Sequence, residues 1–328
     1  MWIKFASLAA AVSFAAFAPA AMAQTDQAAG YPNKPLRFMA GFPPGGVADI
    51  VARIIAPPLA QRLGQPVVID NRSGAGGVIG ADAVAKSPPD GYTIGFGVSG
   101  ALTANVTLMP KLPYDPLRDL ASVSKVVNNP LALVVNSSLG VNTVREFVAL
   151  AKSKPGHLTY GTAGNGTAMN LSGELLKQMT AIDIRHIPYK GSSPAAVDLL
   201  AGHIQAAVLD LATAKGHLES GKLKALAVTS AKRTAIAPEL PTMAEAGVPG
   251  YELNSWFGLI MPAGTPPAIV NRINAELTAV LNDPKIREQL LTAKTEPMPT
   301  SPEEMRTAIR NEIQQTAALI KAANIKLD

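Results

Sequence analysis

Backbone anion binding is the chemistry suited to the glycine-rich stretch AGFPPGGVADIVARI, residues 40–54. Free N–H groups at a helix start, reinforced by the helix dipole, bind carboxylate or phosphate without a charged side chain. Glycine has no Cβ and therefore permits close approach to a ligand. The candidate ligand-binding residues here are Phe42, Pro44, Gly45 and Gly46. We interpret Asp49 as a helix cap. A plain strand-to-helix turn explains this stretch alone equally well.

A second stretch, YGTAGNGTAMN at residues 160–170, has the same design. It follows a predicted strand and opens a predicted helix. Its candidate ligand-binding residues are Ala163, Gly164, Asn165 and Thr167. Two such helix starts are more informative than one, because a cleft between them can hold both ends of a small dicarboxylate.

Ser99 lies in GVSGA, a near match to the G-x-S-x-G nucleophile motif, with Ala101 in place of the second glycine. Ser99, Asp210 and His217 also follow one another in a hydrolase-like order, so a secreted serine hydrolase is one alternative. We favour Ser99 as a hydroxyl that contacts a ligand. Asp210 ends the predicted strand 204–210 and either contacts a ligand or caps the helix predicted after it.

We predict no cofactor and no metal. The glycines in NRSGAGGVIG resemble a dinucleotide-binding loop, but the next predicted strand, 92–98, ends without the acidic ribose partner. The chain has no cysteine, and its four histidines do not form a metal-binding pattern. The net charge of +5 is mild, and no run of Lys or Arg indicates nucleic-acid binding.

The first residues predict export. Lys4 precedes the apolar stretch 5–17, and Ala21 and Ala23 form an A-x-A cleavage signal, so residues 1–23 are a predicted signal peptide that is cleaved after Ala23. No later apolar run is long enough to span a membrane. We expect a soluble, exported product.

Strand and helix patterns alternate through the rest of the chain, which predicts an α/β fold with parallel sheets covered on both faces. The predicted strands include 36–42, 66–70 and 92–98, and a second series begins near residue 130. Three helical stretches, 267–281, 285–293 and 302–322, follow the last strand. We therefore predict two lobes, residues 24–130 plus 255–328 and residues 131–254, with crossovers near 130 and 254.

The whole mature sequence resembles the Bug-type (TctC-like) periplasmic receptors of tripartite tricarboxylate transporters. The resemblance rests on many blocks in the same order, among them YPNKPLRFMAGFPPGGVADIVAR, LGQPVVIDNRSGAGGVIGADAVAKSPPDGYTI, YGTAGNGTAMNLSGELLK, IPYKGSSPAAVDLLAGHIQ and LPTMAEAGVPGYELNSWFGLIMPAGTP. It implies a two-lobed, type II periplasmic binding protein fold in which mostly parallel sheets are hinged by the crossovers. It also implies a monomer, not an enzyme, that captures a carboxylate by closure and delivers it to membrane transporter subunits. A periplasmic ligand sensor for signalling is the alternative.

In such receptors the two glycine loops hold the ligand, Ser99 falls in a hydroxyl-bearing loop, and Asp210 matches an acid that influences ligand preference. Three features depart from the family pattern. VSGA replaces a Ser/Thr-rich segment, and Asn170 replaces a frequent histidine. Pro57-Pro58 interrupts the first helix, where we expect a kink or a restart.

Overall fold

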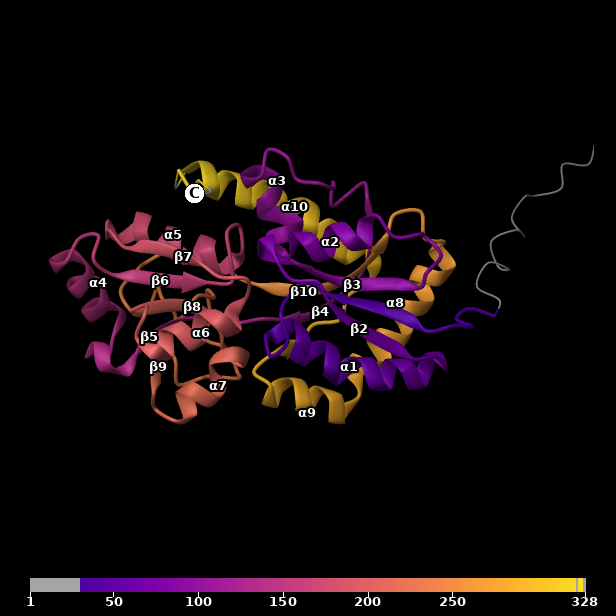
Figure 1. Ribbon diagram of the computed structural model, residues 1–328, viewed down its shortest axis with the longest axis horizontal. Coiled ribbons are helices and arrows are strands. Elements are labelled where there is room, and N and C mark those ends of the chain that lie inside the picture. The colour runs from indigo at the N-terminus through magenta and orange to yellow at the C-terminus, as the bar shows by residue number, and fades with distance from the viewer. Residues whose placement is uncertain (1–29, 323, 327–328) are drawn as a thin grey trace, which may run out of the picture.

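The computed structural model describes residues 30–322 and 324–326, so the predicted signal peptide lies outside the described residues. Two helix-flanked sheets lie side by side (Figure 1). The first, which with its helices we call lobe 1, has the strand order β11-β4-β10-β3-β1-β2. Its strands are β1 (Leu36–Ala40), β2 (Val67–Asn71), β3 (Thr93–Val98), β4 (Leu120–Asn128), β10 (Trp256–Pro262) and β11 (Glu296–Pro297). Its helices are α1 (Val47–Leu63), α2 (Val78–Ala85), α3 (Asn105–Leu108), α8 (Pro267–Asn282), α9 (Pro284–Thr292) and α10 (Pro302–Ala322).

The second sheet and its helices form lobe 2, with the strand order β7-β6-β8-β5-β9. Its strands are β5 (Leu131–Asn136), β6 (Thr159–Thr162), β7 (Arg185–Pro188), β8 (Ala206–Asp210) and β9 (Leu223–Val228). Its helices are α4 (Val144–Ser153), α5 (Ala168–Thr180), α6 (Ser192–Ala201) and α7 (Leu211–Glu219). The α/β fold with two helix-flanked sheets is as predicted.

Most strands of each sheet run in one direction, as predicted, and each sheet also contains antiparallel strands. In lobe 1, β1 pairs in parallel with β2 and β3, but β10 runs antiparallel between β3 and β4. In lobe 2, β6 pairs in parallel with β7 and β8, whereas β5 is antiparallel to β8 and β9. The antiparallel pairs involve the strands next to the crossovers, because a chain that leaves a sheet and later returns to it runs in the opposite direction.

Two crossovers connect the lobes. The chain leaves lobe 1 between Asn128 and Leu131 and returns between Val228 and Trp256. The N–H of Asn129 donates to the carbonyl oxygen of Ser255 at 2.8 Å, so the crossovers lie against each other. β4 and β10 lie toward the middle of the molecule in Figure 1.

Helix α1 runs through both Pro57 and Pro58 as a single element. Of the two expected alternatives, a kink or a restart, the restart does not occur. Each proline removes a helical N–H donor. The buried face of α1, which includes Val51, Ile55 and Leu59, nevertheless packs into the core of lobe 1. Burial of this face offsets the lost hydrogen bonds.

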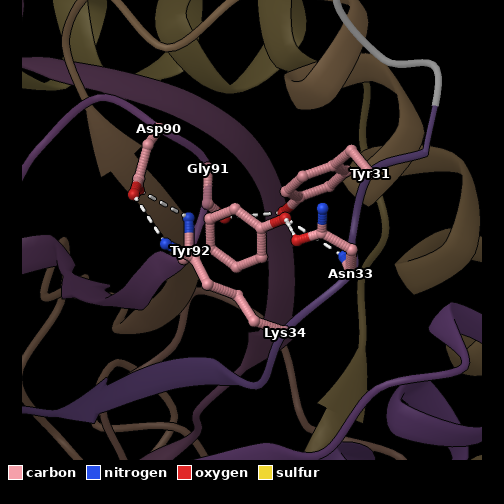
Figure 2. Close-up of polar contacts among 6 residues, drawn as sticks. All are labelled: Tyr31, Asn33, Lys34, Asp90, Gly91 and Tyr92. Atoms are coloured by element: carbon pink, nitrogen blue, oxygen red, sulfur yellow. Dashed lines mark hydrogen bonds and ion pairs between the residues drawn. The ribbon is translucent and has the colours of Figure 1, made fainter.

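The start of the described chain is held against the turn before β3 (Figure 2). The hydroxyl of Tyr31 donates to the carbonyl oxygen of Gly91 at 2.6 Å, and the hydroxyl of Tyr92 donates to Asn33 Oδ1 at 2.8 Å. Lys34 Nζ lies 4.2 Å from the centre of the Tyr92 ring and 3.4 Å from Asp90 Oδ2. These contacts fix β1 beside β3, which places the loop after β1 at the edge of the sheet that faces lobe 2.

The lobes are packed against each other. The main hydrophobic core of lobe 1 includes Ala163, Met169 and Leu171 of lobe 2. Leu319 of α10 contacts the cores of both lobes. Among the described residues, no helix is long and apolar enough to cross a membrane.

Candidate ligand-binding site between the lobes

A small cavity of about 30 Å³ lies between the lobes. Lobe 1 contributes the loop after β1 and the end of β3, and lobe 2 contributes the starts of α5 and α6. The crossover residues Asn129 and Ser255 also line it. No charged side chain is among the described residues that line this cavity. An anion held here therefore depends on backbone N–H groups, hydroxyls and amides.

Asp49 stabilises the loop before α1 through a hydrogen bond to the backbone. Its Oδ2 accepts from the N–H of Gly45 at 3.1 Å and from Arg53 Nε at 2.9 Å. Gly45 has a φ of +79°, a conformation that disfavours residues with a Cβ. The N–H of Gly45 is therefore not free in this structure, and the role of Gly45 in ligand binding stays a prediction. Val47, the first residue of α1, lines the cavity instead, and its N–H has no acceptor within the helix.

The second loop is also held by its own hydrogen bonds. The N–H of Gly164 donates to Thr162 Oγ1 at 3.2 Å, and the N–H of Gly166 donates to Asn170 Oδ1 at 3.1 Å. Thr167 caps α5 by accepting from the N–H of Asn170. The first residues of this helix, Ala168 and Met169, line the cavity and direct their N–H groups away from the helix.

A third helix start, that of α6, faces the first loop directly. A Cβ placed on Gly46 would lie 3.7 Å from Ser193 Oγ, and one on Gly191 would lie 2.7 Å from Pro43 Cδ. Neither α1 nor α6 has a side-chain cap at its N-cap residue, Gly46 or Gly191. Sequence reasoning missed α6 as a site element, although the small residues of KGSSP before a helical pattern were a usable signal.

Asp210 lies at the end of β8 and is fully buried. Its Oδ1 accepts from the N–H of Thr213 at 2.7 Å, so it caps α7, as one of the two predicted roles requires. Burial raises the pKa of this carboxyl, and hydrogen bonds from Ser192 and Thr213 only partly oppose that shift. Asp210 contacts Ser192, which lines the cavity, but it does not line the cavity itself.

The ten predicted ligand-binding residues thus divide into two sets. Five line the cavity, namely Phe42, Gly46, Ser99, Ala163 and Thr167. The others are not among the residues that line it, namely Pro44, Gly45, Gly164, Asn165 and Asp210. The crossover residues Asn129 and Ser255 were missed because an isolated polar residue between two strands carries no motif.

The hydrolase alternative has no support in the geometry. Among the described residues, Ser99 Oγ has no hydrogen-bond partner, so no base activates it. Asp210 is bonded to the start of α7 and not to His217. Within the described part of the chain, no group of three or more His, Asp or Glu side chains is arranged to hold a metal ion.

Residues 51–325 match the family described as tripartite tricarboxylate transporter family receptor, or TctC. The chain belongs to this family. It is 40% identical to Protein BugT of Bordetella pertussis over 298 residues, which are 90% of this chain and 91% of that protein. The family consists of transporter receptors, so this chain is a receptor and not an enzyme.

Two solved structures of Rhodopseudomonas palustris proteins have the same fold. Rpa4515, solved with adipate, superposes with a TM-score of 0.88 at 39% identity, covering 90% of this chain and 99% of that one. MatC, solved with bound malate, superposes with a TM-score of 0.84 at 31% identity, covering 88% of this chain and 100% of that one. The chain is thus a solute-binding receptor with the two-lobed fold of these proteins.

Proposed function

We propose that this receptor captures a small mono- or dicarboxylate between its lobes in the periplasm and delivers it to the membrane subunits of its transporter. The observation that carries the proposal is the convergence of three helix starts, those of α1, α5 and α6, on a cavity without charged lining residues. Helix starts attract anions through their free N–H groups and their dipoles. The relatives solved with adipate and malate support the choice of a carboxylate.

Capture by closure follows from the size of the cavity. About 30 Å³ is too little for a dicarboxylate, so the lobes must separate to admit one. We propose that residues 24–130 plus 255–328 move against residues 131–254 about the two crossovers. Closure is favoured only by a ligand that binds the closed form more tightly than the open one.

Calorimetry with butanoate, succinate, malate, adipate and benzoate tests the proposal. We expect saturable binding of at least one of them with a Kd of about 1 μM, which corresponds to about −8 kcal/mol. Absence of binding across this aliphatic and aromatic panel would contradict carboxylate capture. Loss of uptake of the same compound in a strain lacking the receptor tests delivery to the transporter.

Gly46→Leu tests whether the loop must approach α6. The backbone at Gly46 accepts a side chain (φ −81°), but a Cβ there already lies within 4 Å of Ser192 and Ser193. Forcing a larger group into this contact costs about 1–3 kcal/mol, so we expect about tenfold to hundredfold weaker binding. Gly216→Leu is the matched control, because a Cβ at Gly216 meets nothing within 4 Å. Equal affinities for the two variants would count against the loop.

The remaining proposals concern the form of the protein. We propose cleavage after Ala23, which mass spectrometry of the exported protein tests through a mature chain that begins at Gln24. We further propose that the receptor acts as a monomer, which light scattering with and without ligand tests.

A further inference from the structure

Two polar side chains at the cavity each have a buried oxygen atom that lacks a hydrogen-bond partner among the described residues. Ser99 is 3% exposed and Asn129 is 1% exposed, and both line the cavity. Among the described residues, neither Ser99 Oγ nor Asn129 Oδ1 has a hydrogen-bond partner. Ser99 follows β3, and Asn129 lies in the first crossover, where its N–H is bonded to Ser255. Both groups are therefore fixed by the hinge side of lobe 1.

A buried polar atom left unpaired is costly, so these atoms are expected to meet a ligand group. The amide oxygen of Asn129 can only accept a hydrogen bond. An ionised carboxylate also only accepts, so the carboxylate of the ligand cannot satisfy the Oδ1 atom of Asn129. A ligand group that pairs with this oxygen must carry a hydrogen.

A neutral donor fits this position better than an ammonium group. No acidic side chain is among the described residues that line the cavity, so a buried cation would lack a partner. A hydroxyl can donate to Asn129 Oδ1 while it accepts from Ser99 Oγ, and thereby satisfies both atoms.

We propose that Asn129 and Ser99 recognise a hydroxyl group on the ligand through hydrogen bonds, so that the receptor binds hydroxycarboxylates in preference to their unsubstituted analogues. This inference rests on the proposed capture of a carboxylate. The helix starts bind the carboxylate, and the two hinge-side residues determine specificity. Because Asn129 is on a crossover, the contact also ties recognition of the hydroxyl to closure.

Matched ligand pairs test the inference on the unaltered receptor. Calorimetry at pH 7.5 compares each enantiomer of malate with succinate, and each enantiomer of 3-hydroxybutanoate with butanoate. We expect one hydroxylated member of at least one pair to bind at least about tenfold more tightly, because a site built for a hydroxyl rejects the analogue that lacks it. Equal affinities in both pairs overturn the inference while leaving carboxylate capture intact. Failure of all these ligands and of the wider carboxylate panel overturns the proposed function itself.

Substitutions then assign the preference to residues. Asn129→Leu keeps the approximate volume and removes the acceptor, so it should weaken binding of the hydroxylated ligand about tenfold and leave the analogue unchanged. Ser99→Ala should reduce the preference in the same direction. Asn254→Ala, an exposed change in the second crossover, is the matched control and should keep the preference. If Asn129→Leu does not fold, Asn129→Ala replaces it. A preference that survives at both positions overturns the assignment.

Discussion

Asp210 shows how one residue can stabilise a helix and still carry an electrostatic penalty. Its carboxylate caps α7 through the N–H of Thr213, but the side chain is fully buried and its pKa is raised above 3.8 by that burial. An acid whose pKa is higher in the folded state stabilises the fold below its unfolded pKa. That contribution is lost as the pH rises through the folded value.

Asp210→Asn should therefore stabilise the protein increasingly as the pH rises. Asparagine is as good an N-cap as aspartate, so the bond from Thr213 is retained while the buried charge is removed. Thermal unfolding of both proteins between pH 4 and pH 8 measures this, and the Tm difference should grow in favour of the variant toward pH 8. A difference that is the same at every pH would mean that Asp210 does not titrate as its burial predicts.

At the residue scale, the sequence predicted the two glycine loops and Ser99 but not their hydrogen bonds. Glycine, proline and small polar residues mark a helix start, yet only the folded chain reveals that Asp49 takes the N–H of Gly45. Asn129 could not be predicted either. Its importance depends on the neighbouring crossover at Ser255, which lies far away in the sequence.

At the element scale, α9 and the segment after it hold lobe 2 against lobe 1. Lys215 Nζ of α7 donates to the carbonyl oxygen of Thr292 at 2.9 Å, at the C-terminus of α9. Lys294 Nζ donates to the carbonyl oxygen of Ile236, and the hydroxyl of Thr234 donates to Glu296. These three bonds join the lobes, so we expect them to favour the proposed closed form.

The double variant Lys215→Ala/Lys294→Ala should bind ligand about fivefold more weakly. Two partly exposed, charge-assisted bonds together contribute about 1 kcal/mol, and a smaller closed fraction lowers the apparent affinity. Calorimetry with a carboxylate that binds the unaltered receptor measures this. Lys285→Ala on α9 is the control, because among the described residues its ammonium group has no hydrogen-bond or ion-pair partner. Equal affinities for the double variant and the control would show that these bonds do not favour closure.

Most helices and strands were predictable from periodicity, whereas the positions of the antiparallel strands were not. Hydrophobic spacing located α8, α9 and α10 to within a few residues. The same alternation predicted sheets whose strands mostly run in one direction, but a βαβ pattern does not reveal which strand arrives from the other lobe and runs the opposite way. β10 lies between β3 and β4 in the sheet, although more than a hundred residues separate it from each of them in the sequence. Only tertiary packing determines that position.

For the molecule as a whole, Trp256 is a natural reporter of closure. The sequence contains two tryptophans, and the other, Trp2, lies in the predicted signal peptide. Trp256 begins β10 directly after the second crossover and is 3% exposed. Its Nε1 donates to Glu312 at 2.7 Å, and Lys125 Nζ lies 4.5 Å from its ring. It also lines a second interlobe cleft of about 710 Å³ with Ala168 and Leu171 of lobe 2.

The proposed movement of lobe 2 about the crossovers would therefore change the surroundings of this indole. We expect its emission to shift on addition of an aliphatic carboxylate and to saturate at the same Kd as calorimetry gives. The Trp256→Phe variant should lose the signal and still bind, which separates a report on closure from absorption by the ligand. Unchanged emission during a titration that calorimetry finds saturable would mean that the crossovers do not act as the hinge. Small-angle scattering, which should show a smaller radius of gyration with ligand, would then reveal whether the lobes close at all.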